Sequence, residues 1–360
     1  MTTRRALLVV MTGALLTAGV GACARSPASG RSVRTAAEPP IRVRRAWPVM
    51  GTLLTITAWG ADTAVILVAI HAARDSVRLV DSLMSVYRPE SDISTVNRNA
   101  GGSPIRVAAQ TMHVLRRAHD FWRISGGAFD PTVGPLVDAW GFRGDTGRVP
   151  TAAALDSLRG LIGFQAVQID SAASTVRLSR AGMLLDLGGI AKGYALDLGR
   201  SAMRNAAITG GMLDLGGNVL VFGHPPTGGT WKIGIRHPRS GSALLGMLAL
   251  DSGAVATSGD YEHFYEIDGV RYAHLLDPRT GAPSRGIVAA TAIGPAGQWS
   301  DGLSATLFLS GASRGVSIAD SLRGTGAVYV LDDGTGRVSR AGIVLSARAR
   351  AWFTVDSAVR

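Results

Sequence analysis

The chain has 360 residues, of which 46% are hydrophobic and 18% are charged, so it is long enough to bury a large core as one domain or two closely packed ones. This composition excludes a disordered or fibrous protein, and beyond the N-terminus no apolar run reaches the roughly 18 residues of a spanning helix. The formal charge of +11 favours an anionic partner. The arginines are scattered, and the sequence lacks zinc-finger spacing, an aromatic RNA-binding strand motif and a basic helix, so we expect no nucleic-acid binding.

Residues 1–22 have the pattern of a lipoprotein signal peptide. Arg4 and Arg5 precede an apolar stretch over residues 6–20, and small residues lead to Cys23. The sequence Val20-Gly21-Ala22-Cys23 resembles a bacterial lipobox, in which the chain is cleaved before the cysteine and the sulfur carries diacylglycerol. An ordinary signal peptide with an incidental cysteine is the alternative, and the arginine pair also resembles a twin-arginine export signal. We therefore expect an exported protein that is lipid-anchored to a membrane and faces the periplasm or the cell exterior.

Residues 23–40 are predicted to be a flexible tether from the lipidated Cys23. They contain several prolines and small residues and few large apolar side chains, so they cannot form a core. Cys23 is the only cysteine, which excludes a disulfide within the chain. Removal of residues 1–22 takes away two arginines and no acidic residue, and the remaining charge of +9 belongs to the body. No linker divides residues 41–360, so we expect them to be a single catalytic unit.

Hydrophobic periodicity predicts a mixture of strands and helices from Ile41 onward. Alternation predicts a strand at Leu53–Ala58, and apolar residues at helical spacing predict a helix from Ile66 to Met84. Further helices are expected at Val107–Trp122, at Ala152–Leu161 behind the cap Thr151, from near Gly189 through Leu198, and from near Asp301. The other expected strands are a hairpin of Gln165–Asp170 and Thr175–Ser179, followed by Met212–Phe222, Thr230–Arg236, Tyr261–Ile267 and Ile287–Ile293. Strands and helices do not alternate regularly, so the predicted fold class is α+β, with mixed sheets and packed helices.

Two glycine-rich segments are candidate phosphate-binding turns, although the common dinucleotide and P-loop motifs are missing. Asp186-Leu187-Gly188-Gly189 stands at an expected strand exit and helix start. Free N–H groups and the helix dipole favour an anion there, and Lys192 adds a mobile positive charge. The second segment is Asp214–Asn218. Either segment taken alone is better explained as a tight turn whose glycines serve packing.

Other motifs accompany these segments in a fixed order. They are Met50–Thr52, Ser85–Ser94 with Asn97, Gly127–Leu136 with Trp140–Phe142, Ala256–Tyr261, His274–Gly281 and Asp301–Ser304. Each motif is weak alone, but in this order and spacing the set resembles the ApbE family from about residue 42 to the end. The resemblance implies an ApbE-like fold and a Mg²⁺-dependent enzyme that binds FAD and breaks its pyrophosphate. Such an enzyme joins FMN by a phosphoester to a Thr or Ser of an acceptor protein and releases AMP.

The resemblance also implies roles for individual residues. The flavin or adenine parts of FAD would contact Met50, Tyr87, Ala128, Phe129 and Asp130, and the ribityl or phosphate region would contact Asp186 and Lys192. His274 would also bind FAD. Mg²⁺, which prefers oxygen ligands, would be held by Asp301 and the backbone carbonyl of Gly189. The residues assigned to catalysis are His274 and Asp301, because a histidine can remove a proton from an attacking hydroxyl. Outside its motif, Tyr87 would be explained as a partly buried core aromatic.

The metal loop departs from the family pattern D-x-x-x-T. Ala305 stands four residues after Asp301, and a methyl group cannot bind magnesium. On a helix, Ser304 lies nearer the Asp301 face than Thr306 does, so we predict Ser304 or a water as the substitute ligand. Two other functions stay open, namely an FAD pyrophosphatase that yields FMN and AMP, and an FAD-binding lipoprotein without turnover. The alanine favours the second of these.

Overall fold

The computed structural model describes residues 40–144, 146–204, 208–334 and 337–359. The predicted signal peptide, Cys23 and the tether up to residue 39 lie outside the described residues. Residues Pro39–Arg360 form one compact unit. In the described ranges, no helix is both long enough and apolar enough to cross a membrane.

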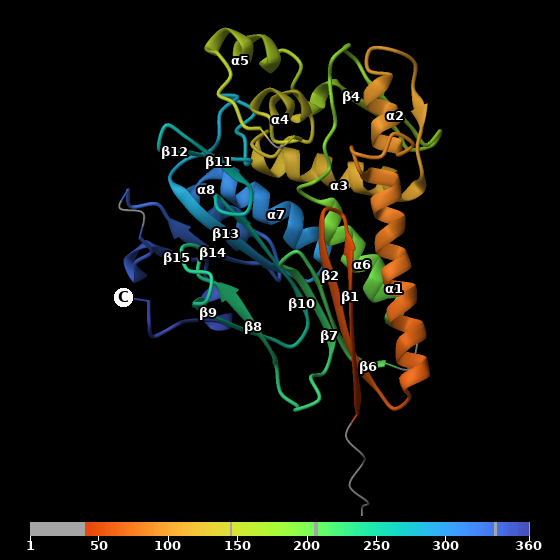
Figure 1. The fold of residues 1–360 in the computed structure, drawn as a ribbon, viewed down its shortest axis with the longest axis vertical. Helices are drawn as coiled ribbons and strands as arrows, with labels where there is room; N and C mark the ends of the chain where they lie inside the picture. Colours follow the sequence, from red (N-terminus) through yellow and green to blue (C-terminus); the bar gives the residue numbers. More distant parts are fainter. Residues whose placement is uncertain (1–39, 145, 205–207, 335–336, 360) are drawn as a thin grey trace, which may run out of the picture. The chain divides into compact units, whose positions relative to one another are not determined.

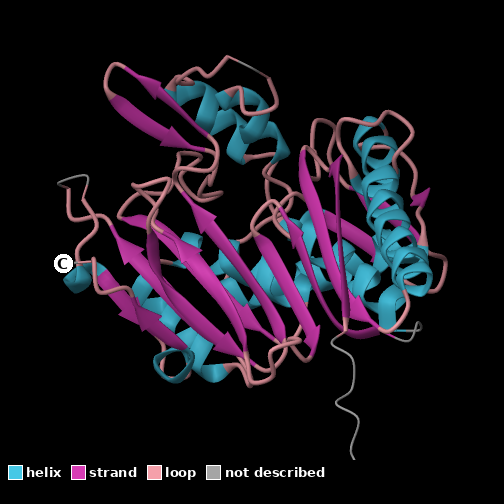
Figure 2. Ribbon diagram, turned by 60° about the horizontal axis from the view of Figure 1, so that its bottom comes forward, coloured by secondary structure: helices cyan, strands magenta, loops and turns pink. Residues whose placement is uncertain are grey.

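An eight-stranded antiparallel sheet runs through this unit (Figure 2). Its strand order is β1-β2-β6-β7-β10-β13-β14-β15. These strands are β1 (Ile41–Val49), β2 (Thr52–Gly60), β6 (Ile208–Leu215), β7 (Asn218–Gly223), β10 (Gly253–Gly259), β13 (Ile287–Gly294), β14 (Gly326–Leu331) and β15 (Ile343–Leu345). Every residue of β13 is buried, because both faces of the sheet are covered at this strand.

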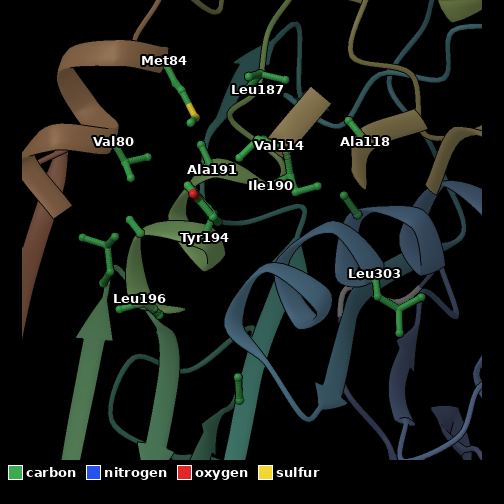
Figure 3. Packing of buried hydrophobic residues seen from close by; sticks show 14 of the residues in the cluster. Val80, Met84, Val114, Ala118, Leu187, Ile190, Ala191, Tyr194, Leu196 and Leu303 are labelled. Atoms are coloured by element: carbon green, nitrogen blue, oxygen red, sulfur yellow. The ribbon is translucent and has the colours of Figure 1, made fainter. Parts of the chain in front are cut away.

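Helices cover one face of the sheet (Figure 2). They are α1 (Thr63–Met84), α6 (Ala191–Arg204), α7 (Gly297–Ser310) and α8 (Ala312–Ser321), and α3 (Ala109–Ser125) packs on α7 and α1. Figure 3 shows Met84 of α1, Val114 of α3, Tyr194 of α6 and Leu303 of α7 among the side chains of this buried layer. Burial of such side chains is the main favourable contribution to folding, at about 1.5–3 kcal/mol for each large one.

A small sheet covers the other face. It has the order β16-β9-β8 and consists of β8 (Trp231–Arg236), β9 (Leu244–Leu250) and β16 (Phe353–Val355). Side chains alternate along β13 after a bulge near its start: Ala289 and Ile293 belong to the core beneath this small sheet, whereas Ala290 and Ala292 belong to the core beneath the helices. Ala290 and Ala292 leave room for α7 to approach the central sheet closely.

A third group of elements lies beyond one end of the sheet (Figures 1 and 2). It contains α4 (Gly134–Trp140), α5 (Ala152–Arg159) and the hairpin of β11 (Phe264–Ile267) and β12 (Val270–Ala273). Leu136, Trp140, Phe142 and Leu276 form its buried core. The remaining elements are α2 (Asp92–Arg98), β3 (Ile105–Arg106), η1 (Phe164–Ala166), β4 (Val167–Asp170), β5 (Thr175–Leu178), η2 (Arg340–Gly342) and α9 (Ala349–Trp352).

Helices α6 and α7 cross at a pair of glycines. A side chain at Gly193 would meet the Gly297 carbonyl oxygen at 2.1 Å, so the two backbones are in direct contact. Each helix also caps the other. Asp197 of α6 accepts hydrogen bonds from Gly297 N (2.9 Å) and Gln298 N (2.8 Å), and Asp301 of α7 accepts one from Gly193 N (2.8 Å). The crossing therefore fixes Asp301 at the N-terminus of α6.

The α+β fold class is confirmed, and most predicted elements lie within a few residues of the observed ones. The prediction of one strand over Met212–Phe222 is wrong. Gly216 (φ 62°) and Gly217 (φ 90°) turn the chain there, so the segment becomes the hairpin of β6 and β7. Helix α7 begins at Gly297, before the expected start near Asp301, because its N-terminal cap comes from α6.

Candidate active site

A cavity of about 900 Å³ lies between the β1–β2 turn, the segment after α1 and the N-terminus of α6. Four of the predicted FAD-binding residues, Met50, Tyr87, Asp186 and Lys192, line this cavity. They come from three segments that are far apart in the sequence. The volume is in the range of pockets that enclose cofactor-sized ligands.

Met50 lies in the tight turn between β1 and β2. Its φ is 53° and that of Gly51 is 69°, so both central residues of the turn have left-handed backbone conformations. Such a two-residue turn matches the twist of a hairpin, but a side chain at the first position costs roughly 1–3 kcal/mol of strain. The strained residue lines the cavity.

Tyr87 lies in the segment between α1 and α2, and 69% of its surface is exposed. The segment is fixed at its ends, since the Ser91 hydroxyl donates to Ser85 O (2.7 Å) and accepts from Ser94 N (3.0 Å) as the cap of α2. The phenol pKa is raised by partial burial and by the nearby carboxylate of Asp186, so the ring is neutral at physiological pH. This placement excludes a core aromatic and leaves the ring available for stacking.

Asp186 and Lys192 frame the N-terminus of α6. The Asp186 carboxylate accepts from Gly188 N (2.9 Å), and its backbone N–H donates to Pro131 O (2.7 Å) in another motif. Lys192 Nζ donates to Gly188 O at 3.1 Å. Within the described part of the chain, Lys192 forms no salt bridge, so its charge is free to act on a ligand.

Ala128, Phe129 and Asp130 are buried and do not line the cavity. The Asp130 carboxylate accepts from Thr132 N (2.8 Å), Thr132 Oγ1 (2.6 Å) and Phe164 N (3.0 Å), and burial raises its pKa. The Phe129 ring lies beneath Gly189, where a side chain would meet it at 3.3 Å. In this structure the three residues support the α6 turn, and their contact with FAD stays a prediction.

His274 directly follows β12 and is half-buried. The carbonyl of His263 accepts both its backbone N–H (3.0 Å) and its Nδ1 (3.0 Å), and the two imidazole rings stack with centroids 5.8 Å apart. A carbonyl only accepts, so Nδ1 carries the hydrogen and Nε2 has a free lone pair. Burial lowers the pKa of His274 to about 4, and the charges of Lys192 and Asp186 also act on it. At neutral pH, His274 is therefore an uncharged base near the cavity.

Asp301 is 96% buried, with only 4% of its surface exposed. Its Oδ2 accepts from Gly193 N and its Oδ1 from the Asn218 side chain, both at 2.8 Å. Each carboxylate oxygen has further lone-pair capacity and can still bind a cation. Asn218, the last residue of the second glycine-rich segment, has no individual role in the sequence motifs.

The ApbE family model matches residues 50–330. The chain belongs to the ApbE family. The FAD:protein FMN transferase of Treponema pallidum is 32% identical over 348 residues, covering 91% of this chain and 91% of that protein. The protein of the same name from Vibrio cholerae is 31% identical, covering 79% of this chain and 86% of that protein. Among solved structures, the ApbE protein of Thermotoga maritima has a TM-score of 0.78 and 30% identity, covering 87% of this chain and 99% of that chain.

The departure from the ApbE metal pattern is visible in α7. Ala305 is the α7 residue that faces Gly189, since a side chain at Gly189 would meet the Ala305 methyl at 3.7 Å. The Ser304 hydroxyl donates to Asp301 O (2.9 Å) and lies 2.9 Å from the Ser258 hydroxyl. Because the Ser304 hydroxyl donates its hydrogen to Asp301 O, it accepts the hydrogen bond from Ser258. One lone pair on the Ser304 oxygen is left for a cation.

These oxygens fit a hard cation but supply few protein ligands. In the described ranges, no group of three or more His, Cys, Asp or Glu side chains could hold a metal. One buried carboxylate, a hydroxyl and a backbone carbonyl match the preference of Mg²⁺, which takes few carboxylates and completes its shell with water and substrate phosphates. The roles of Asp301, Ser304 and Gly189 as ligands stay predictions.

Proposed function

We propose that this chain is an FAD:protein FMN transferase, which moves FMN from FAD to a Thr or Ser hydroxyl of an acceptor protein. Its relatives in Treponema pallidum and Vibrio cholerae carry that name. The observation that carries the proposal is the arrangement at the cavity. An uncharged histidine lies close enough to Lys192 and Asp186 for their charges to act on it, and those two residues line the cavity at the N-terminus of α6.

FAD would bind through both its rings and its phosphates. Tyr87 offers an exposed neutral ring on which an aromatic system can stack, and Met50 adds an apolar contact in the same cavity. Lys192 and the positive end of the α6 dipole would hold the pyrophosphate. With the pyrophosphate held there, the reacting phosphorus would lie near His274.

The transfer is a displacement at phosphorus. His274 Nε2 takes the proton of the acceptor hydroxyl, and the hydroxyl oxygen forms a bond to the phosphorus of the FMN half. The bond between that phosphorus and the bridging oxygen breaks, and AMP leaves with the electron pair. The proton on His274 then passes to the departing phosphate or to solvent. Lys192 would stabilise the charge that develops on the phosphate oxygens.

Mg²⁺ is proposed as the cofactor of this reaction. Asp301, the Gly189 carbonyl and Ser304 or a water would hold it. Bound there, Mg²⁺ supplies positive charge to the pyrophosphate oxygens. The helix crossing keeps the Asp301 carboxylate in place, because both of its oxygens already accept hydrogen bonds.

The proposal includes export and a lipid anchor. Cys23 would carry the lipid, and residues 23–40 would link it to the catalytic unit outside the cytoplasm. An acceptor protein on the same side of the membrane would then meet the cavity. The basic residues in the signal peptide and the small residues before Cys23 support this part of the proposal.

One experiment separates the possible outcomes. Purified chain lacking residues 1–22 is mixed with FAD, Mg²⁺ and a candidate acceptor, and the acceptor mass and AMP are measured. A transferase adds the mass of FMN to the acceptor and releases an equal amount of AMP. Release of AMP together with free FMN would identify a pyrophosphatase instead, and FAD binding without AMP would identify a non-catalytic flavin-binding protein.

A further inference from the structure

The charges that line the cavity nearly cancel. They come from Asp81, Arg88, Asp186 and Lys192. Arg88 Nε and Nη2 both donate to Asp81 Oδ2, at 2.9 and 2.6 Å, so these two residues neutralise each other. The remaining carboxylate of Asp186 would offset the attraction of Lys192 for a phosphate unless another cation compensated for it.

Arg143 is placed to be that cation. Its Nη2 lies 3.2 Å from Asp186 Oδ2, and its Nε lies 2.5 Å from Asp138 Oδ1. Only 20% of the Arg143 side chain is exposed, whereas Asp138 is 44% exposed and therefore better screened by water. The charges of Arg143 and Asp186 both shift the pKa of the Tyr87 phenol. Because Tyr87 lines the cavity, the ion pair lies beside it.

The segment that carries Arg143 is held in place on both sides. The Tyr265 hydroxyl lies 3.0 Å from Gly141 O and 2.7 Å from Gly144 O, and can donate to either. The preceding ring of Phe142 stacks on Tyr265 with centroids 5.2 Å apart. The guanidinium is thus positioned before any ligand arrives, and such preorganisation reduces the cost of binding.

We infer that Arg143 is a positioning residue that neutralises Asp186, so that this wall of the cavity accepts the diphosphate of FAD. The inference rests on the proposed function, because it takes FAD as the ligand. Arg143 acts through Asp186 and does not itself line the cavity. Without Arg143, the Asp186 carboxylate would face the ligand phosphates and offset the charge of Lys192.

The test compares a charged with an uncharged flavin. FAD and riboflavin are titrated into the chain lacking residues 1–22, in EDTA so that no turnover occurs, with wild type and Arg143→Met. We expect Arg143→Met to weaken FAD binding by roughly tenfold and riboflavin binding by less than about twofold, since riboflavin has no phosphate. Arg143→Lys should restore part of the FAD affinity. The loss of FAD affinity should shrink at high salt, because it is electrostatic.

Arg159→Met is the matched control. Arg159 belongs to α5 in the same group of elements, is 43% exposed and pairs with Asp156 away from the cavity. Its replacement should leave both affinities unchanged. Equal, salt-independent losses for the two flavins would show that Arg143 only supports the fold, and an unchanged FAD affinity would also overturn the inference. If wild type fails to bind FAD, the proposed function itself fails.

Discussion

The hydrogen bond to the backbone carbonyl of His263 determines which nitrogen of His274 can accept a proton. Because His263 O accepts from Nδ1, the proton-accepting nitrogen is Nε2. Burial keeps the ring uncharged, since the free energy of a buried imidazolium is raised by loss of solvation. A histidine with an ordinary pKa would be partly protonated near pH 6.5 and would lose part of its capacity as a base.

The activity should therefore have no acidic limb near pH 6.5. The His274 pKa is lowered to about 4, so the neutral base is present above that pH and is lost as the pH falls through it. We expect kcat/KM for AMP release with acceptor to stay level from pH 7 down to about pH 5.5. His274→Asn should remove most of the activity at every pH. A midpoint near pH 6.5 in the wild-type profile would contradict this assignment.

The alanine at position 305 offers a test of the metal site. Ala305→Thr places a hydroxyl toward Gly189, and we expect it to lower the Mg²⁺ concentration for half-maximal AMP release by roughly tenfold. Ala305→Val is the matched control, because valine has the shape of threonine without the oxygen. Asp301→Asn should abolish Mg²⁺-dependent AMP release, and Ser304→Ala should raise the Mg²⁺ requirement slightly. Equal effects of the Thr and Val variants would show that the hydroxyl does not reach the cation.

At the scale of elements, the crossing of α6 and α7 contributes to the stability of the fold and also holds Asp301, the proposed metal ligand, in place. An alanine Cβ at Gly193 would lie 2.1 Å from Gly297 O and 2.6 Å from Asp301 Cβ, so the helices would have to separate. We expect Gly193→Ala to lower the free energy of unfolding by roughly 2–4 kcal/mol, measured by urea denaturation.

Gly199 in the same helix is the control for this prediction. A Cβ there would meet the end of the Leu213 side chain at 2.8 Å, and a side chain can move where a backbone cannot. Alanine also has a higher helix propensity than glycine, by about 1 kcal/mol. Gly199→Ala should therefore change stability little. If both variants lose the same stability, close contact of the helix backbones is not what holds the crossing.

The elements that sequence periodicity predicted well are those with one apolar face. Helix α1 buries Ile66, Ile70, Val77 and Met84 along one side, and this spacing is visible in the sequence. Strand β13 is buried throughout because it lies between two layers, and most of its residues are apolar. The start of α7 is not visible in the sequence, because its cap, Asp197, belongs to another helix. The single strand predicted over Met212–Phe222 follows from the apolar residues on both sides of Gly216 and Gly217, although Asp214–Asn218 also has the sequence of a tight turn.

In the candidate site, too, some residues could be predicted from the sequence and others could not. Motif resemblance selected Met50, Tyr87, Asp186 and Lys192, and the structure brings them to one cavity. Arg143 has no role in the sequence motifs, because its ion pair with Asp186 joins residues 43 positions apart and no local pattern predicts such a contact. Ion pairs and cross-element caps depend on the tertiary arrangement, which periodicity does not describe.

For the whole molecule, the proposed membrane anchor and the charge of the body would act together. The chain without residues 1–22 has a formal charge of +9, so anionic lipid headgroups attract it whether or not it is lipidated. The described residues contain no helix that could cross a membrane. Stable attachment by acyl chains, in contrast, does not weaken when salt screens the charges.

Cys23→Ser should therefore release the exported protein from membranes in high salt. The expected lipid on Cys23 has more than one acyl chain, and each buried CH₂ contributes about 0.8 kcal/mol, so the wild type should stay in the membrane fraction during a salt wash. The variant cannot carry a thioether-linked lipid and is held only by screened charge. Metabolic labelling with a fatty acid, followed by fractionation in low and high salt, measures both properties. Retention of Cys23→Ser in high salt would show that another part of the chain anchors it, and an unlabelled wild type would refute the lipobox interpretation.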